Sequence, residues 1–412
     1  MDTDHLIIGG GAAGVFAALT AAEYGRRCII LEPNEQIGRK LRITGKGRCN
    51  LTNNCTQSEF MEHIPRNNSF LYSSIARCTP QDIMYYFSNL GVPLKTERGN
   101  RVFPVSDKAQ DIVQALALEL KKKKIPVIRE KVKSLCIENG CCVGAKTTNG
   151  KIYRAATTLL ATGGISYPAT GSTGDGFRMA EKVGHTIISP VPSLVPIETE
   201  EVWCKDAMGL SLKNVSLKLY NKNKCIYESL GEMLFTHFGV SGPLVLRASA
   251  HILDEAPENY YLKIDLKPGL NIEQLDKRLQ RDFSEMPNKA IGTILRGLLP
   301  TKLIPVILLL IELSPETKAH DITRVQRQAL ANQIKNLPLT IKAFRPVEEA
   351  IITRGGICVK EINAKTMESK LMPNLYFAGE IIDVDGYTGG FNLQIAFSTA
   401  FSAGTAMALK DI

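Results

Sequence analysis

The chain has 412 residues, of which 44% are hydrophobic and 22% charged. At about 150 residues per domain, this length predicts two to three domains, each able to bury a full core. The composition is that of an ordinary globular protein and argues against a disordered, collagen-like or membrane-embedded chain. The chain has 50 Lys and Arg residues against 41 Asp and Glu residues, a net charge of +9. This charge favours an anionic partner, although a soluble enzyme that is merely basic explains it equally well.

Targeting segments and metal sites are not expected. The strongest apolar run, residues 306–311, falls far short of the roughly 20 residues that span a bilayer. The first residues are acidic where a signal peptide is basic, so we expect a cytoplasmic protein without membrane contact. The ten cysteines include no Cys-x-x-Cys pair and no Cys/His zinc spacing, which predicts reduced thiols and no metal.

The N-terminal residues predict a dinucleotide-binding β-α-β unit. A strand at 6–8 is followed by a glycine turn, a helix at 12–24 and a strand at 28–31. The turn, residues 9–14, matches G-x-G-x-x-G and suits a pyrophosphate at the helix N-terminus, which predicts cofactor contacts at Gly9, Gly11, Ala13 and Gly14. Glu32, eighteen residues after Gly14, is placed to bind an adenosine ribose. The alternative is a purely structural glycine turn.

The middle of the chain predicts a second, β-rich domain. Helices are expected at 79–90 and 108–123, and short strands with Asn-Gly turns fill 125–161, ending in a buried strand at 157–161. Prolines at 190, 192 and 196 suggest a boundary. Beyond them, strands are expected at 216–220, 260–266 and 339–344, with helical periodicity over 271–336.

The C-terminal segment decides between FAD and NAD. A strand over 375–380, an acidic residue, a glycine loop at 386–390 and a helix from about 392 to 409 resemble the closing element of the glutathione-reductase-like FAD fold. Residues 161–164 resemble the short glycine motif of that fold. The resemblance implies an FAD site that includes Thr162, Gly163, Gly379, Glu380, Asp383, Gly390, Phe391 and Asn392. The alternative is a glycine loop before an ordinary core helix.

Four further motifs resemble one family over essentially the whole chain. They are GRKLRITGKGRCNLTN at 38–53, LFTHFGVSGP at 234–243, TRGG at 353–356 and the segment 379–394. Together they look like the BaiN/RdsA (YhiN) family of FAD-dependent oxidoreductases, which includes aminoacetone-oxidase-like flavoproteins. The resemblance implies an α/β fold in which a glutathione-reductase-like Rossmann FAD domain (1–190 and 354–412) is interrupted by a β-barrel-like substrate domain (191–270 and 337–353) with a helical insertion (271–336).

The family implies a flavoenzyme but leaves its substrate open. Its members have been linked to reduction of uridine to dihydrouridine in large-subunit ribosomal RNA, reduction of a bile-acid ring double bond, and oxidation of aminoacetone. We expect NAD(P)H-driven reduction of an activated C=C, with ribosomal RNA as partner. A small-molecule enone reductase or amine oxidase is the alternative, and a non-catalytic flavin-containing binding protein is a third. The glycines at 171–176 lack the context of a second dinucleotide turn, so NAD(P)H is expected to visit the flavin transiently.

Three residues are candidates for catalysis. Cys49 lies in a glycine-flanked loop with Lys46 and Arg48. It could act as a thiolate stabilised by these cations or as a thiol that donates a proton; the alternative is a buried structural thiol. His237 precedes a Ser-Gly-Pro turn, and Tyr387 lies in the loop expected beside the flavin. Each is equally explained by packing.

Basic residues outside these candidates are expected to bind anions. Lys40, Lys46 and Arg48 are expected at the pyrophosphate or an anionic substrate, unless they form a solvated basic loop. The charged helices of 271–336 suit an RNA-facing surface, although solvation alone also explains their charge.

Overall fold

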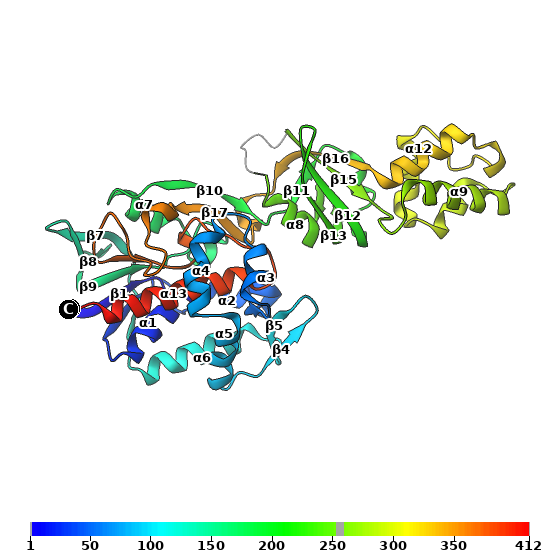
Figure 1. Ribbon diagram of the computed structural model, residues 1–412. Coiled ribbons are helices and arrows are strands. Elements are labelled where there is room, and N and C mark those ends of the chain that lie inside the picture. The colour runs from blue at the N-terminus through cyan, green and yellow to red at the C-terminus, as the bar shows by residue number, and fades with distance from the viewer. Residues whose placement is uncertain (1, 253–258, 412) are drawn as a thin grey trace. The chain divides into compact units, whose positions relative to one another are not determined.

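The N-terminal β-α-β unit forms where the sequence places it. In the computed structural model, which describes residues 2–252 and 259–411, it consists of β1 (Asp2–Ile8), α1 (Ala12–Glu23) and β2 (Cys28–Leu31). The chain divides into two units: unit 1 comprises Met1–Ser193 and Val347–Ile412, and unit 2 comprises Leu194–Pro346. Both ends of the chain therefore build unit 1, and its middle builds unit 2 (Figure 1).

A seven-stranded sheet forms the centre of unit 1. Its order is β6-β2-β1-β9-β8-β7, with β18 also paired to β9. β6, β2, β1, β9 and β18 form the parallel part of the sheet. On its other edge, β9 pairs antiparallel with β8, and β8 pairs antiparallel with β7. The remaining strands of the sheet are β6 (Val127–Ile128), β7 (Val132–Glu138), β8 (Cys141–Thr147), β9 (Ile152–Leu160) and β18 (Leu375–Phe377).

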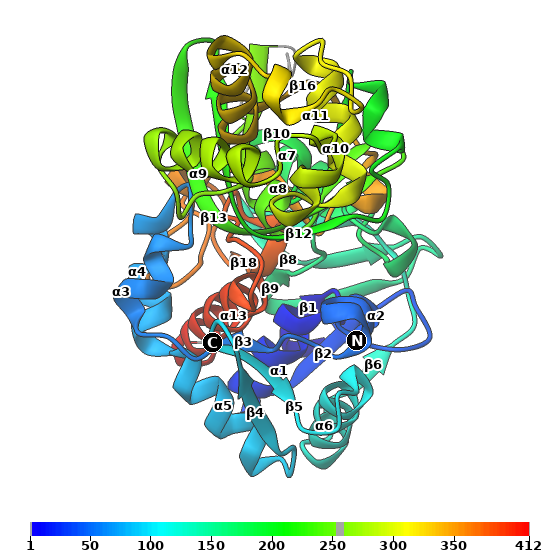
Figure 2. The ribbon, with the colours of Figure 1, turned by 90° about the vertical axis from the view of Figure 1, so that its right-hand side faces the viewer.

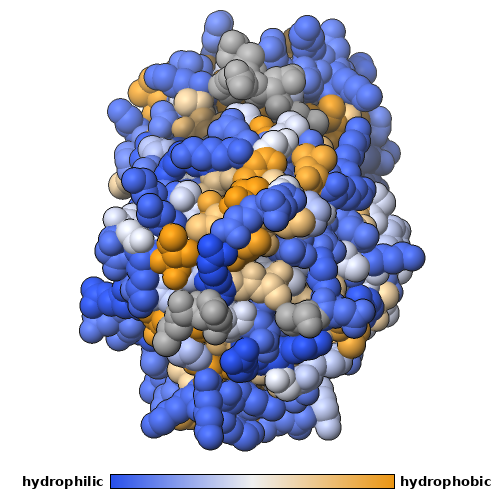
Figure 3. Space-filling model, turned by 90° about the vertical axis from the view of Figure 1, so that its left-hand side faces the viewer, coloured by the Kyte–Doolittle hydropathy of each residue, from blue (hydrophilic) through white to orange (hydrophobic). Residues whose placement is uncertain are grey.

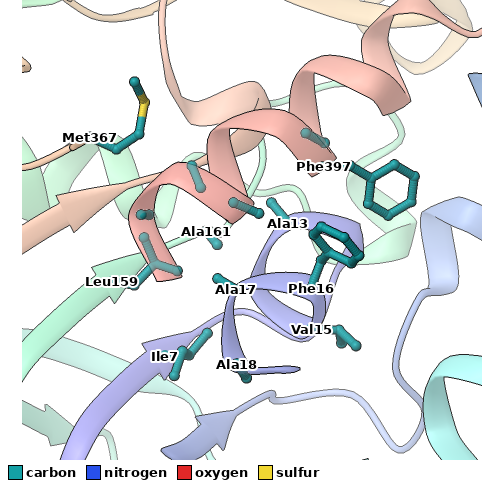
Figure 4. Packing of buried hydrophobic residues seen from close by; sticks show 14 of the residues in the cluster. Ile7, Ala13, Val15, Phe16, Ala17, Ala18, Leu159, Ala161, Met367 and Phe397 are labelled. Carbon is teal, nitrogen blue, oxygen red and sulfur yellow. The ribbon is translucent and has the colours of Figure 1, made fainter. Parts of the chain in front are cut away.

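Two small-residue helices from opposite ends of the chain pack together beside this sheet. α13 (Phe391–Leu409) runs alongside α1 (Figure 2). Both helices are buried over most of their length, and small residues such as Ala13 and Ala17 of α1 lie where the two helices meet (Figure 4). A Cβ on Gly404 would come within 2.6 Å of the Ala17 carbonyl oxygen, so the contact requires glycine there.

The predicted helices at 79–90 and 108–123 are confirmed as α5 (Pro80–Asn89) and α6 (Ala109–Lys122). The Thr79 side chain caps α5 by accepting from the Asp82 N–H, with proline in the first turn.

Several elements of unit 1 were not predicted from the sequence. They are α2 (Arg39–Ile43), α3 (Gln57–Glu62), α4 (Asn68–Arg77), α7 (Asp175–Glu181), the sheet β3 (Thr52–Asn53), β4 (Leu94–Glu97) and β5 (Arg101–Pro104), and the pair β10 (Ile187–Ser193) and β17 (Ile352–Ile357).

Unit 2 is a closed six-stranded barrel with helices inserted between its last two strands. The barrel order is β11-β14-β13-β12-β15-β16, and α8 (Pro243–Ser249) packs against β13. Its strands are β11 (Ile197–Thr199), β12 (Ser211–Asn221), β13 (Lys224–Thr236), β14 (Gly239–Ser241), β15 (Tyr260–Asp265) and β16 (Leu337–Phe344). The inserted helices are α9 (Ile272–Glu285), α10 (Ile291–Ile294), α11 (Ile304–Leu310) and α12 (Arg324–Lys335).

Most of the apolar run at 306–311 belongs to α11. Ile307 and Leu308 are buried in the core that the inserted helices share with the barrel, whereas Leu309 and Leu310 are exposed. Among the described residues, none of the helices has the length and apolar character that a membrane crossing requires. On the face drawn in Figure 3, hydrophilic side chains predominate and apolar ones gather in a limited central area. The expected fold class, a Rossmann-type α/β unit with a separate barrel, is confirmed.

Candidate functional site

The glycines of the turn between β1 and α1 are needed for different structural reasons. Gly9 has a φ of +110°, and a Cβ there would overlap the carbonyl group of Ala161. A Cβ on Gly14 would overlap the Gly9 carbonyl oxygen, so this glycine lets α1 approach β1. A Cβ on Gly11 would meet no atom within 4 Å. Packing therefore requires Gly9 and Gly14, whereas Gly11 leaves open space at the start of α1.

That open space belongs to a cavity of about 400 Å³ within unit 1. A cavity of this size is in the range of small-molecule and cofactor sites. The glycine turn, the end of β2, the segment 38–41 and the start of α13 all line it. The predicted cofactor residues that line it are Gly9, Gly11, Ala13, Glu32, Lys40, Thr162, Gly163, Gly379, Glu380 and Asn392. An elongated dinucleotide such as FAD fits this arrangement, because Gly11 provides a cradle that a side chain would fill.

Glu32 supports the glycine turn as well as lining the cavity. One carboxylate oxygen accepts the Gly10 backbone N–H at 2.7 Å, and the other accepts the backbone and side-chain N–H groups of Asn34 at 2.9 and 2.6 Å. The side chain is buried. Carboxylate oxygens carry further lone pairs, so Glu32 can hold the turn and still accept from a ribose.

We expect Glu32→Ala to weaken FAD binding by about tenfold or more, because hydrogen bonds to a charged group are lost and the Gly10 N–H loses its partner. The measurement is a fluorescence titration of flavin-free protein with FAD. Glu35→Ala is the matched control, since Glu35 is exposed in the same loop and does not line the cavity. An unchanged FAD affinity in Glu32→Ala would remove Glu32 from the site.

An ion pair between distant segments lies at the cavity wall. The Lys40 ammonium donates to Glu380 at 2.5 Å and to the Ser166 hydroxyl at 2.6 Å. The other Glu380 oxygen accepts from the Ser166 hydroxyl at 2.7 Å and from the Thr353 N–H at 2.9 Å. Lys40 is thus already paired with a carboxylate, and its charge is less available to a phosphate than the sequence suggested.

Lys40→Met is expected to destabilise the flavin-free protein, because Glu380 would keep its partly buried charge without a cation. A double-mutant cycle with Glu380→Gln should give a coupling free energy of about 1–3 kcal/mol. Urea unfolding of the four proteins measures it. Additive effects of the two substitutions would show that the ion pair contributes no stability.

The loop that carries Cys49 begins at the cavity wall, which Thr44 lines, but its charged residues make their contacts elsewhere. Arg48 pairs with Glu97 and with Asp107, and its guanidinium lies 4.1 Å from the centroid of the Phe103 ring. Lys46 is exposed, and both Lys46 and Cys49 have φ of 59°. None of Lys46, Arg48 and Cys49 is among the cavity-lining residues. The charges of this loop therefore hold it against the β4–β5 hairpin.

Burial raises the pKa of the Cys49 thiol to about 12, and its side chain is completely buried. This environment gives no support to a thiolate at neutral pH, because the thiol loses its proton only as the pH approaches that raised pKa. Cys49 as a proton donor stays a prediction.

The burial of Cys49 predicts its alkylation behaviour. With iodoacetamide at about pH 8, folded protein should be modified at the exposed Cys225, whereas Cys49 should react only after unfolding. Peptide mass spectrometry measures both rates in one sample. Modification of Cys49 in folded protein as fast as that of Cys225 would contradict the burial.

A second charged cluster, missed by sequence reasoning, fixes the loop before α13. Arg66 donates to Asp383 at 2.7 Å and approaches Asp385 at 3.4 Å. The Ser193 hydroxyl donates to Asp385 at 3.0 Å. Burial raises the pKa of Asp385, against the opposing effect of Arg66. Asp383 thus binds Arg66 and does not line the cavity; no local sequence pattern pointed to Arg66 as its partner.

Of the residues at the start of α13, some pack in the core and others line the cavity. Gly390, with φ +100°, is the N-cap, and the Phe391 ring is buried and stacks on His63 at 4.3 Å. Neither lines the cavity. Asn392 lines it and binds the N–H and the carbonyl of Gly386 at 2.8 and 2.7 Å. The Tyr387 N–H donates to the His63 carbonyl at 2.9 Å.

Tyr387 and His237 lie in different units. Tyr387 is half-buried in unit 1 and does not line the cavity, although the loop that carries it is tied to Asn392, which does. His237 is exposed in the turn between β13 and β14 of unit 2, with its ring edge-on to Phe238. Among the residues that the structure describes, no group of three or more His, Cys, Asp or Glu side chains is arranged to hold a metal ion.

Comparison with known proteins finds relatives over the full length. A family model described as HI0933-like protein Rossmann domain matches residues 3–406. A 3-dehydro-bile acid delta(4,6)-reductase of Clostridium scindens is 31% identical over 408 residues, 98% of each chain. A ribosomal RNA dihydrouridine synthase of Haemophilus influenzae is also 31% identical, over 97% of each chain. The solved 3-ketosteroid-delta4-(5alpha)-dehydrogenase of Rhodococcus jostii RHA1 matches with a TM-score of 0.51 and 14% identity, over 99% of this chain and 97% of that one, a likeness in fold alone.

Proposed function

This chain belongs to the HI0933-like Rossmann family and is an FAD-dependent oxidoreductase, and we propose that it reduces an activated C=C bond of uridine in large-subunit ribosomal RNA. One observation carries the proposal. Two relatives match nearly the whole chain at equal identity, and their names are ribosomal RNA dihydrouridine synthase and 3-dehydro-bile acid delta(4,6)-reductase. Both names describe saturation of a C=C bond in an enone-like ring. The net charge of +9 favours the polyanionic substrate.

The chain's own residues would bind the cofactor and order the reacting groups. When bound, FAD supplies the hydride that such a reduction requires. The cavity residues from Gly9 to Glu32 would hold its adenosine and pyrophosphate, and Glu380 and Asn392 would face the remainder. NAD(P)H is proposed as the reductant, visiting the site without a binding domain of its own.

Of the three catalytic candidates, we favour Tyr387 as the group that donates a hydrogen bond or proton to the substrate. Its loop is fixed on one side by the His63 carbonyl and on the other by Asn392, a cavity residue. A phenol can donate a hydrogen bond that polarises the uridine carbonyl, or it can protonate the carbon of the C=C bond that does not receive the hydride. Cys49, fully buried, and His237, exposed in unit 2, remain alternatives.

The second candidate function is reduction of a small-molecule enone, which the bile acid reductase relative favours equally by identity. An anaerobic experiment separates the two. Bound flavin is first reduced with NADPH or NADH, and its reoxidation by ribosomal RNA or a steroid enone is then followed at about 450 nm. Aminoacetone is added instead to the oxidised protein, because an amine oxidase would use it to reduce the flavin. Reoxidation by RNA with dihydrouridine detected by mass spectrometry supports the proposal, whereas reoxidation by the enone alone rejects it.

A further inference from the structure

The outer face of the barrel carries an aromatic and basic surface, which we call the Tyr-Lys face: Lys218, Tyr220, Tyr261, Lys263 and Lys342. β12 and β15 are neighbours in the barrel (Figure 1), and their register pairs Tyr220 with Tyr261 and Lys218 with Lys263. The two tyrosine rings are parallel within 1°, with centroids 4.9 Å apart. The Lys263 ammonium lies 5.2 Å from the Tyr220 centroid and 5.7 Å from that of Tyr261.

These side chains are not part of the barrel core. Their neighbours along the strands, Leu219 and Leu262, are completely buried, and strand alternation turns the tyrosines and lysines to the other side. Both tyrosines and Lys263 are partly exposed, and Lys342 is exposed. A cross-strand aromatic pair alone would stabilise the sheet, but it does not require lysines beside it.

The charge of this face points to a polyanion. Lys218 is paired with Glu228 at 3.3 Å, whereas Lys263 and Lys342 form no ion pair with any carboxylate in the described part of the chain. On α9, by contrast, Arg278 and Arg281 pair with Asp282 on their own helix. Positive charge without a paired carboxylate among the described residues is thus found beside aromatic rings on the barrel. On α9 the two arginines are paired, and the exposed Lys277 is unpaired among the described residues.

We propose that the Tyr-Lys face binds single-stranded RNA, with a base stacked on the tyrosine pair and phosphates at Lys263 and Lys342. Stacking on aromatic side chains combined with lysine contacts to the backbone is how proteins hold unpaired nucleotides. An acidic protein partner would use the lysines but has no bases to place on the rings. The inference rests on the proposed function, because it supplies the surface that would hold a ribosomal RNA substrate.

The test measures binding of a fluorescein-labelled oligouridylate of about 12 nucleotides to the FAD-loaded protein by anisotropy. Tyr220→Ala and Tyr261→Ala should each weaken binding by about tenfold, and Tyr220→Phe and Tyr261→Phe should retain it, because stacking needs the ring only. Tyr85→Ala is the matched control, since Tyr85 is 70% exposed in unit 1. FAD content and NAD(P)H oxidation with an artificial acceptor should not change.

Lysine variants test the phosphate contacts while both tyrosine rings are kept. Lys263→Met should lower the slope of log K against log salt by about 0.7, and Lys277→Met on α9 should not. Three outcomes would overturn the inference. RNA affinity could fall as much in Tyr85→Ala as in the Tyr220 and Tyr261 variants, or a Phe variant could bind RNA as weakly as its Ala counterpart. The salt slope could also change in Lys277→Met and not in Lys263→Met.

Parallel assays distinguish failure of this inference from failure of the proposed function. If the wild-type protein forms dihydrouridine in ribosomal RNA while the tyrosine variants bind and react normally, the Tyr-Lys face is rejected and the function stands. If the wild-type protein neither binds the oligonucleotide at low salt nor reduces uridine, but reduces the enone, the function and the inference both fall.

Discussion

Gly11→Val is expected to yield a purified protein that carries almost no FAD. The open space beside Gly11 belongs to the cavity, so the valine methyl groups would occupy the position that a pyrophosphate must approach. We expect the FAD dissociation constant to rise by at least about 100-fold, equivalent to about 2.7 kcal/mol. The ratio of absorbance at 450 and 280 nm and a titration of flavin-free protein measure the change.

The loss should concern the ligand and not the fold. A side chain at Gly11 meets no protein atom within 4 Å, and the same holds for Gly297, which lies in the helical part of unit 2 and provides the matched control Gly297→Val. Both variants should keep the wild-type circular dichroism spectrum, and Gly297→Val should keep its FAD. Full flavin content in Gly11→Val would refute the assignment of this turn to the cofactor.

Tyr387→Phe should slow substrate reduction by about 10²-fold or more and leave flavin reduction by NAD(P)H nearly unchanged. A residue that protonates or polarises the substrate acts in the second half-reaction only, where general acid catalysis contributes about 10² to 10⁴-fold. Stopped-flow measurement of the two half-reactions, under anaerobic conditions, separates them. Phenylalanine keeps the ring, whose edge-on contact with His63 has a centroid distance of 6.1 Å.

Cys49→Ala and His237→Ala complete this comparison. The burial of Cys49 predicts that its replacement affects stability more than the substrate half-reaction. A large loss confined to the substrate step in Cys49→Ala, with Tyr387→Phe unaffected, would transfer the role to the cysteine. The same pattern in His237→Ala would transfer it to the barrel histidine.

Local patterns in the sequence predict those parts of this protein that depend on neighbours in the chain. The strand, glycine turn and helix at residues 6–24 were predictable because the G-x-G-x-x-G spacing is local, and Gly14 is required by contact with Gly9 and Ile7 of the same unit. The contact of Gly9 with Ala161, by contrast, joins segments that are distant in the sequence. The capped start of α5 and the hairpins of β7 to β9 follow from local residue types in the same way. The motif resemblance added the cofactor and the family, which full-length relatives support.

Contacts between side chains that are far apart in the sequence became apparent only in the folded structure. Lys40 and Glu380 are separated by 340 residues, and no local pattern predicts that the lysine is paired with a carboxylate at the cavity wall. Arg48 bonds Glu97 and Asp107 and Arg66 bonds Asp383, so charges expected at the cofactor are used to fix loops. The stacked pair Tyr220 and Tyr261 exists because barrel closure sets two strands in register. Long-range pairing of this kind depends on the register and packing of whole elements, which composition and spacing do not encode locally.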